Sequence, residues 1–184
     1  LVSAVGAAAP NALSASLAIT TASSAALDAL IAAMFASPAG TRTFTSTGSV
    51  WVPDFDDTHK RNVSSAIPAQ AATTTVNANN GVTNADFTAF VAEFAGLKTG
   101  GAKQQTAKKN FAATAPWTTD PLLLTQDSLV ICIVVNVSGS SQTSTTTGSG
   151  FSALAGTGIT AGAIANVNEG NVMHVSWGNF AAGA

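Results

Sequence analysis

Three carboxylates and two cations stand close together in one short stretch of this chain. Asp54, Asp56 and Asp57 are followed by Lys60 and Arg61, although only 9% of the 184 residues are charged. Carboxylates at this spacing repel one another unless a cation or hydrogen-bond donors stabilise them. Oxygen ligands suit a hard metal ion, calcium before magnesium. The stretch is therefore the first candidate for chemistry in this sequence.

The acidic cluster has two interpretations, and the residues alone leave both open. In one, it is a solvated loop whose acids pair with Lys60 and Arg61. In the other, it holds a divalent cation. It is not an EF-hand loop, because the glycine at the sixth position and the glutamate at the twelfth are missing. The cluster supplies too few ligands, so a main-chain carbonyl or a neighbouring subunit would complete the shell; candidate side chains are Asp120, Asp127, Glu169 and Asn179.

The remaining reactive residues form no recognisable catalytic pattern. The sequence has no phosphate-binding loop, no zinc-type Cys/His spacing and no Gly-x-Ser-x-Gly elbow, so we predict that it is not an enzyme. His59 and His174 are the only histidines, and His174 in an alternating segment is expected to be structural. Cys132, the only cysteine, excludes an internal disulfide and lies in an apolar run, where a buried small hydrophobe is expected.

Composition narrows the partners that we expect. The net charge of −2 argues against a free-standing nucleic-acid binder. The only basic run consists of Lys98, Lys103, Lys108 and Lys109. We interpret it as a solvated loop in preference to a phosphate or RNA contact. No window holds about 18 uninterrupted apolar residues, so no membrane span is predicted. Low charge with much Ala, Ser, Thr and Gly suggests packing against copies of the same chain.

Several short strands are predicted to position these residues. Alternation and β-branched residues predict strands over 13–21, 41–52, 72–76, 128–137 and 171–180. Residues 25–35 fit a helix or a strand, and short helices are expected within 58–69 and from Asn84 to Gly96. Pro53 is expected to end its strand and leave the acidic cluster beyond it. Many strands with few helices indicate an all-β fold, a single antiparallel sandwich or jelly roll.

One segment resembles a known family. The stretch Thr47-Gly48-Ser49-Val50-Trp51-Val52-Pro53-Asp54-Phe55-Asp56-Asp57-Thr58 is similar to the strand and Asp-x-x-Asp turn of coat proteins from small icosahedral RNA plant viruses, the sobemoviruses and tombusviruses. The resemblance implies an eight-stranded jelly-roll shell domain over 13–184, preceded by an arm segment over 1–12. It implies calcium bound between subunits by Asp54 and Asp57. Asp56, an extra acid between these two, and Asn179 are further possible ligands that the resemblance does not itself supply. Residues 129–137 and 171–180 would be the last strands.

The sequence thus predicts a capsid protein that assembles with copies of itself into a virion shell around single-stranded RNA. A different class of protein also fits the composition. A secreted or surface β-sandwich module, such as an adhesin or pilin subunit, often has this Ser/Thr/Ala/Gly content and low charge. Closed isometric shells in electron microscopy would distinguish the first from monomers or fibres of the second.

Overall fold

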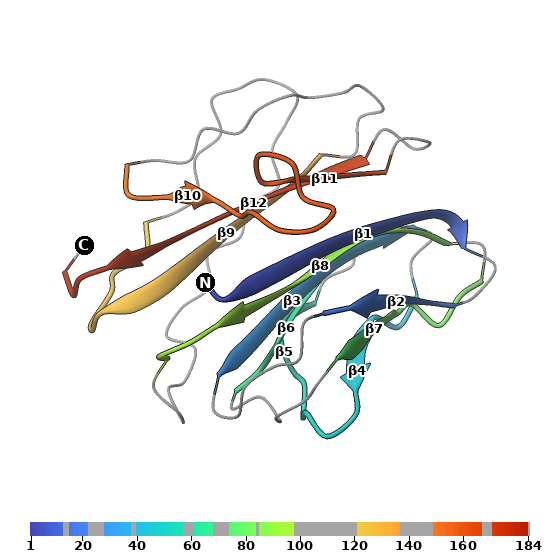
Figure 1. Cartoon of the computed structure of the whole chain (residues 1–184), viewed down its shortest axis with the longest axis horizontal. Coiled ribbons are helices and arrows are strands. Elements are labelled where there is room, and N and C mark those ends of the chain that lie inside the picture. Colours follow the sequence, from blue (N-terminus) through green and yellow to red (C-terminus); the bar gives the residue numbers. More distant parts are fainter. Residues whose placement is uncertain are drawn as a thin grey trace.

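The computed structural model is built from β-strands (Figure 1). It describes residues 1–12, 15–21, 28–37, 40–56, 61–67, 74–83, 85–97, 121–136, 149–166 and 171–183. Within these ranges there are twelve strands, every strand pair is antiparallel, and there is no helix. The prediction of an all-β antiparallel fold is therefore confirmed, and none of the described residues forms a helix that could cross a membrane.

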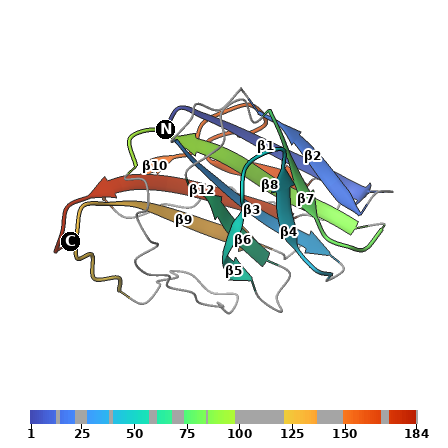
Figure 2. The same cartoon turned by 90° about the horizontal axis from the view of Figure 1, so that it is seen from below.

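A five-stranded sheet lies in the middle of the molecule (Figures 1 and 2). Its strands, in spatial order, are β1 (Ser3–Ala12), β8 (Ala85–Phe94), β3 (Ala29–Ser37), β6 (Arg61–Ala66) and β5 (Val52–Asp56). The inner strands β3 and β8 are buried at almost every described position, on both faces. A strand covered on both sides reads as a continuous apolar run, because neither face meets water.

Two smaller sheets cover the faces of the central sheet. One has the order β2 (Ser16–Thr20), β7 (Thr75–Asn79) and β4 (Thr43–Ser46). The other is built around β12 (Asn171–Phe180) and contains β9 (Ser128–Asn136), β10 (Ser152–Ala153) and β11 (Ala163–Asn166). Since β9 pairs with β12 from Val172 to Phe180, the short strands β10 and β11 lie along its opposite edge.

Two apolar clusters hold the three layers together. Toward the β12 sheet, Phe90 and Phe94 pack with Met173, and all three are at most 2% exposed. Toward the β2–β7–β4 sheet, the residues of β8 on either side of Phe90 pack with Ile19 and Phe44. Alternate residues of the same strand therefore enter different cores, as the two-residue period of a strand requires.

The predicted helix from Asn84 to Gly96 is wrong in the described residues. The apolar positions Phe87, Phe90, Val91 and Phe94 suggested a helical stripe, but Ala85–Phe94 is the strand β8. Both faces of β8 are buried, so apolar residues occur on both faces and the helical spacing is accidental. The short helix expected within 58–69 is likewise replaced, over Arg61–Ala66, by the strand β6.

Most of the predicted strands are found, with shifted bounds. The strands expected over 128–137 and 171–180 are β9 and β12, and the one over 13–21 corresponds to β2. The strand expected over 72–76 overlaps β7 only at Thr75 and Val76. The strand alternative for 25–35 is confirmed by β3, whereas the segment 41–52 contains β4 and only the first residue of β5. Residues 1–12, expected as an extended arm, contain β1, which pairs with β8; the division into an arm and a shell domain stays a prediction.

Candidate functional site

The strand β5 carries two of the three clustered acids at the edge of the central sheet. Asp54 and Asp56 lie on β5, which pairs with β6 only, among the described strands. Pro53 lies within this strand and does not end it, so that prediction was wrong. An edge strand tolerates proline because the missing N–H can face away from the ladder.

The pairing of β5 with β6 is irregular at Asp54. Pro53 lies opposite Ser64 and Phe55 lies opposite Val63, so Asp54 has no residue opposite it. An extra residue of this kind is a β-bulge, which bends an edge strand and re-aims its side chains. The half-buried Asp54 therefore owes its placement to a local break in the ladder.

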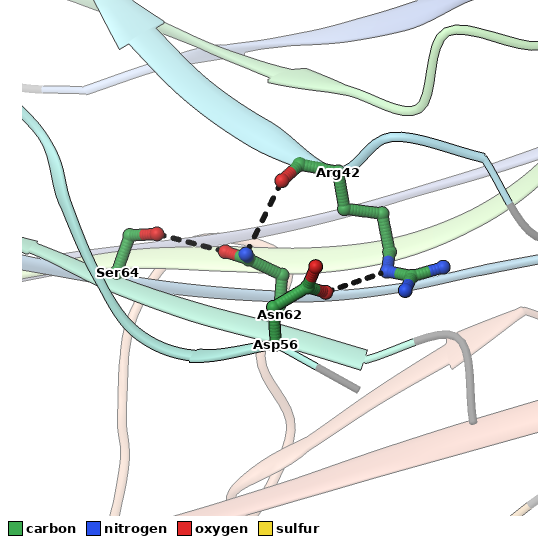
Figure 3. Close-up of polar contacts among 4 residues, drawn as sticks. All are labelled: Arg42, Asp56, Asn62 and Ser64. Atoms are coloured by element: carbon green, nitrogen blue, oxygen red, sulfur yellow. Dashed lines mark hydrogen bonds and ion pairs between the residues drawn. The ribbon is translucent and has the colours of Figure 1, made fainter. Parts of the chain in front are cut away.

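The partner of Asp56 is an arginine that is distant in sequence. Arg42 Nε donates a hydrogen bond to Asp56 Oδ1 over 3.1 Å (Figure 3). The Arg42 side chain is 6% exposed and that of Asp56 is 46% exposed, so the ion pair joins a buried arginine to a carboxylate at the surface. Of the cations expected to pair with the acids, Lys60 lies outside the described residues, and the guanidinium carbon of Arg61 lies 5.8 Å from the centroid of the Phe55 ring.

Two buried polar side chains of β6 extend this ion pair into a network. Asn62 Nδ2 donates to the main-chain oxygen of Arg42 over 3.2 Å, and Ser64 Oγ donates to Asn62 Oδ1 over 2.8 Å (Figure 3). Asn62 and Ser64 are each 2% exposed, so these bonds satisfy polar groups that have lost their water. Since Arg42 directly precedes β4, the network joins the edge of the central sheet to the β2–β7–β4 sheet.

The other predicted site residues are distributed as follows. Asp57 lies outside the described residues, as do Lys98, Lys103, Lys108 and Lys109. Asn179 is exposed on β12, in a different sheet from Asp54, and lines a surface hollow together with Asp127. Among the described residues, no three His, Cys, Asp or Glu side chains are grouped as metal ligands. The calcium site stays a prediction.

Sequence reasoning missed Arg42, Asn62 and Ser64. Arg42 stands 14 positions before Asp56 and 20 before Asn62, and no motif links residues at such distances. Asn62 and Ser64 stand two positions apart in β6, which is also what a solvated strand face would show. A buried face and a solvated face of β6 can be distinguished only from the layer that contains β4, because this layer buries Asn62 and Ser64.

The single cysteine lies in the middle of β9. Cys132 is half-buried and faces Ser176 across the β9–β12 ladder. Burial raises the pKa of the Cys132 thiol, and the Ser176 hydroxyl lowers that pKa to a smaller extent. A thiol that keeps its proton is a poor nucleophile. The neighbouring His174 is 6% exposed on β12, in the interior of a strand.

The comparisons with known proteins add no relative. No family model, no curated protein and no solved structure matches this chain. The order of the strands, the state of the sheet edges and the polar network around Asp56 are therefore the observations from which a function can be argued.

Proposed function

We propose that this chain is a coat protein that assembles with copies of itself into a closed icosahedral shell around single-stranded RNA. The observation that carries the proposal is the nested pairing of β1 with β8, β2 with β7 and β3 with β6. A jelly roll is a long antiparallel hairpin folded over into two sheets, so its first strand pairs with its eighth, its second with its seventh and its third with its sixth. This eight-stranded arrangement is a common fold of capsid subunits.

Two features depart from the strand pairing of an eight-stranded jelly roll. The innermost pair of the hairpin would be β4 with β5, but β5 pairs with β6 instead. The segments 129–137 and 171–180, expected as the last strands of the roll, belong to the additional β12 sheet. We interpret this sheet as a third layer added after the eight nested strands. It covers the face of the central sheet that a two-layer roll would leave outside.

The edges of the central sheet disfavour strand exchange at that sheet. The outer side of β1 is occupied between Ala4 and Gly6, because Gly6 N donates to Thr157 O over 2.8 Å and Thr157 N donates to Ala4 O over 3.1 Å. The outer edge of β5 contains Pro53 and the bulge at Asp54. A pilin-like module that adds a donor strand needs a free, regular edge. Both ends of the central sheet lack one, so strand exchange is disfavoured at this sheet, although not at the β12 sheet.

Calcium remains part of the proposal, with Asp54 and Asp57 as ligands. Asp56 is engaged by Arg42 through Oδ1, which makes it the weaker candidate of the three acids. Asp54 is half-buried on an edge strand of the central sheet, and an incomplete ligand set suits a site shared between subunits. Without the ion, the facing carboxylates repel and the contact weakens.

Electron microscopy of the purified protein, with and without single-stranded RNA, tests the proposal. Closed isometric particles are expected, whereas monomers or fibres in both samples would contradict it and favour the binding-module alternative. For calcium, sedimentation of particles with a chelator at mildly alkaline pH should show swelling. The double variant Asp54→Asn and Asp57→Asn should remove the response to chelator. The matched control is Asp28→Asn, at an acid that is not a candidate ligand, and it should keep the response.

A further inference from the structure

The strand β9 is an edge strand of a different kind from β1 and β5. It pairs with β12 over its length with no register shift, and no other described strand pairs with it. Residues 129–135 are seven apolar residues in succession, without charge, proline or glycine. Every one of them is half-buried. A long, regular, uncharged edge strand is a template for pairing with another chain.

The sequence of β9 is close to a palindrome. Its nine residues read Ser-Leu-Val-Ile-Cys-Ile-Val-Val-Asn, with Cys132 in the middle. Moving outward from Cys132, the two arms carry isoleucine at the first position, valine at the second, an aliphatic residue at the third and a polar residue at the fourth. A strand of this kind presents nearly the same series of side chains in both directions, so antiparallel pairing with its own copy places like residues opposite one another.

We propose that β9 pairs with β9 of a second copy of this chain, antiparallel, about a two-fold axis at Cys132. The choice of a second copy as the occupant rests on the proposed function, which already requires self-association. Ile131 would lie opposite Ile133 of the partner subunit, and Val130 opposite Val134 of the partner subunit. The contact is isologous, because the same strand serves on both sides. The two β12 sheets would then form one continuous sheet across the dimer.

This register keeps each side chain on the appropriate face. Positions that lie opposite one another are separated by an even number of residues, so core-facing residues meet core-facing residues. Ile131 and Ile133 already pack against the core shared with the central sheet, and their partners would extend that apolar surface. The outward main-chain groups of β9 would gain the hydrogen bonds of a second ladder.

The first experiment uses the cysteine at the axis. Residues directly opposite in an antiparallel pair have Cα atoms about 4.5–5.5 Å apart, which lies within the range that a disulfide spans. Mild oxidation of the native protein at alkaline pH should therefore give a Cys132-linked dimer on non-reducing gels. Cys132→Ser should give none. Absence of the linked dimer, together with a monomer in light scattering, would overturn the proposal.

The second experiment fixes the register. In a Cys132→Ser background, Val130→Cys and Val134→Cys are made as separate proteins. Neither should cross-link with itself, and the two mixed should cross-link with each other, because these positions face one another only in the proposed register. Self-linking of the Val130→Cys protein would show another register and would overturn this one.

The third experiment breaks the contact. Cys132→Asp places two like charges at the axis and should convert the dimer to a monomer, whereas Val50→Asp, at a position 77% exposed on the β4–β5 link, should leave it intact. Circular dichroism checks that both variants keep the strand signal. Should Cys132→Asp unfold the chain, the register experiment still decides. If shells form without β9 cross-links, the β9 contact is rejected and the proposed function stands. If cross-linked dimers form without shells, the β9 contact stands and the proposed function is rejected.

Discussion

The edges of the central sheet differ from the β9 edge of the β12 sheet, with which no second strand pairs among the residues that the structure describes. The outer side of β1 is hydrogen-bonded to Thr157, and β5 carries Pro53 and a bulge. The edge of β9 has neither device among the described residues, although its composition makes it the most prone to pairing. Proteins usually protect such edges. An edge left regular beside two blocked ones is therefore informative about where this chain accepts a partner.

The comparison also shows that blocking an edge needs particular residues. At β1 it needs glycines, because the segment 156–158 runs close to the strand. A Cβ atom at Gly156 would overlap the carbonyl oxygen of Ala4, and one at Gly158 would overlap that of Gly6. Close main-chain approach of this kind is a reason for glycine in a strand or a neighbouring loop.

The largest effect is expected from Gly156→Val. The added side chain must displace the loop from β1 or distort both, and overpacking of this kind costs about 1–3 kcal/mol. The denaturant midpoint should fall accordingly, and light scattering should show new association as the β1 edge becomes free. Ala155→Val, at the exposed neighbouring position, is the control and should change neither. An unchanged midpoint for Gly156→Val would mean that the loop does not close this edge.

The second effect is expected from Asp56→Asn. It removes the charged acceptor of the Arg42 hydrogen bond, and because the carboxylate is about half exposed the loss should be about 1–2 kcal/mol of unfolding free energy. Chemical denaturation measures it. The matched control is Asp127→Asn at an exposed acid that accepts a hydrogen bond from Ala182 N near the C-terminal end, where a smaller loss is expected. Equal losses for the two variants would show that the Arg42 network does not stabilise the β5 edge.

A smaller effect concerns the thiol of β9. Burial raises the pKa of Cys132, so the folded state favours the protonated thiol. The stabilisation is complete below the pKa of the unfolded thiol, about 8.5, and is lost as pH rises through the higher folded value. Alkylation by iodoacetamide should be slower in the folded protein than in urea, by about tenfold for each unit of pKa elevation. Equal rates would place the thiol in open solvent.

The sequence predicts the fold class well where periodicity and burial agree. The strand β9 was found because β-branched residues favour it, and β12 was found because its residues alternate. The strand β8 was missed because both of its faces are buried, so its apolar residues carry no strand period. The central position of β8 comes from long-range pairing with β1 and β3, which no local pattern contains.

The candidate site was predictable in its acids and not in its partners. The cluster at 54–57 stands out because the rest of the chain is so poor in charge. Its arginine partner comes from the segment before β4, and the bulge that sets Asp54 apart depends on the register with β6. Both are consequences of how the sheets stack, and stacking follows from the whole core.

The smallest effect, and the sharpest for the comparison, is expected from Pro53→Thr. Threonine restores an N–H on the edge strand and suits a strand by propensity, so the stability of the monomer should change by less than about 0.5 kcal/mol. Its association should rise, because one of the two devices that protect β5 is gone. Sedimentation velocity at rising concentration measures this, with Val52→Thr as the control at the adjacent exposed position. If the association of the Pro53→Thr protein does not rise, the bulge at Asp54 alone suffices to block the edge. The absence of a bulge in β9 then becomes the feature that distinguishes the two edges.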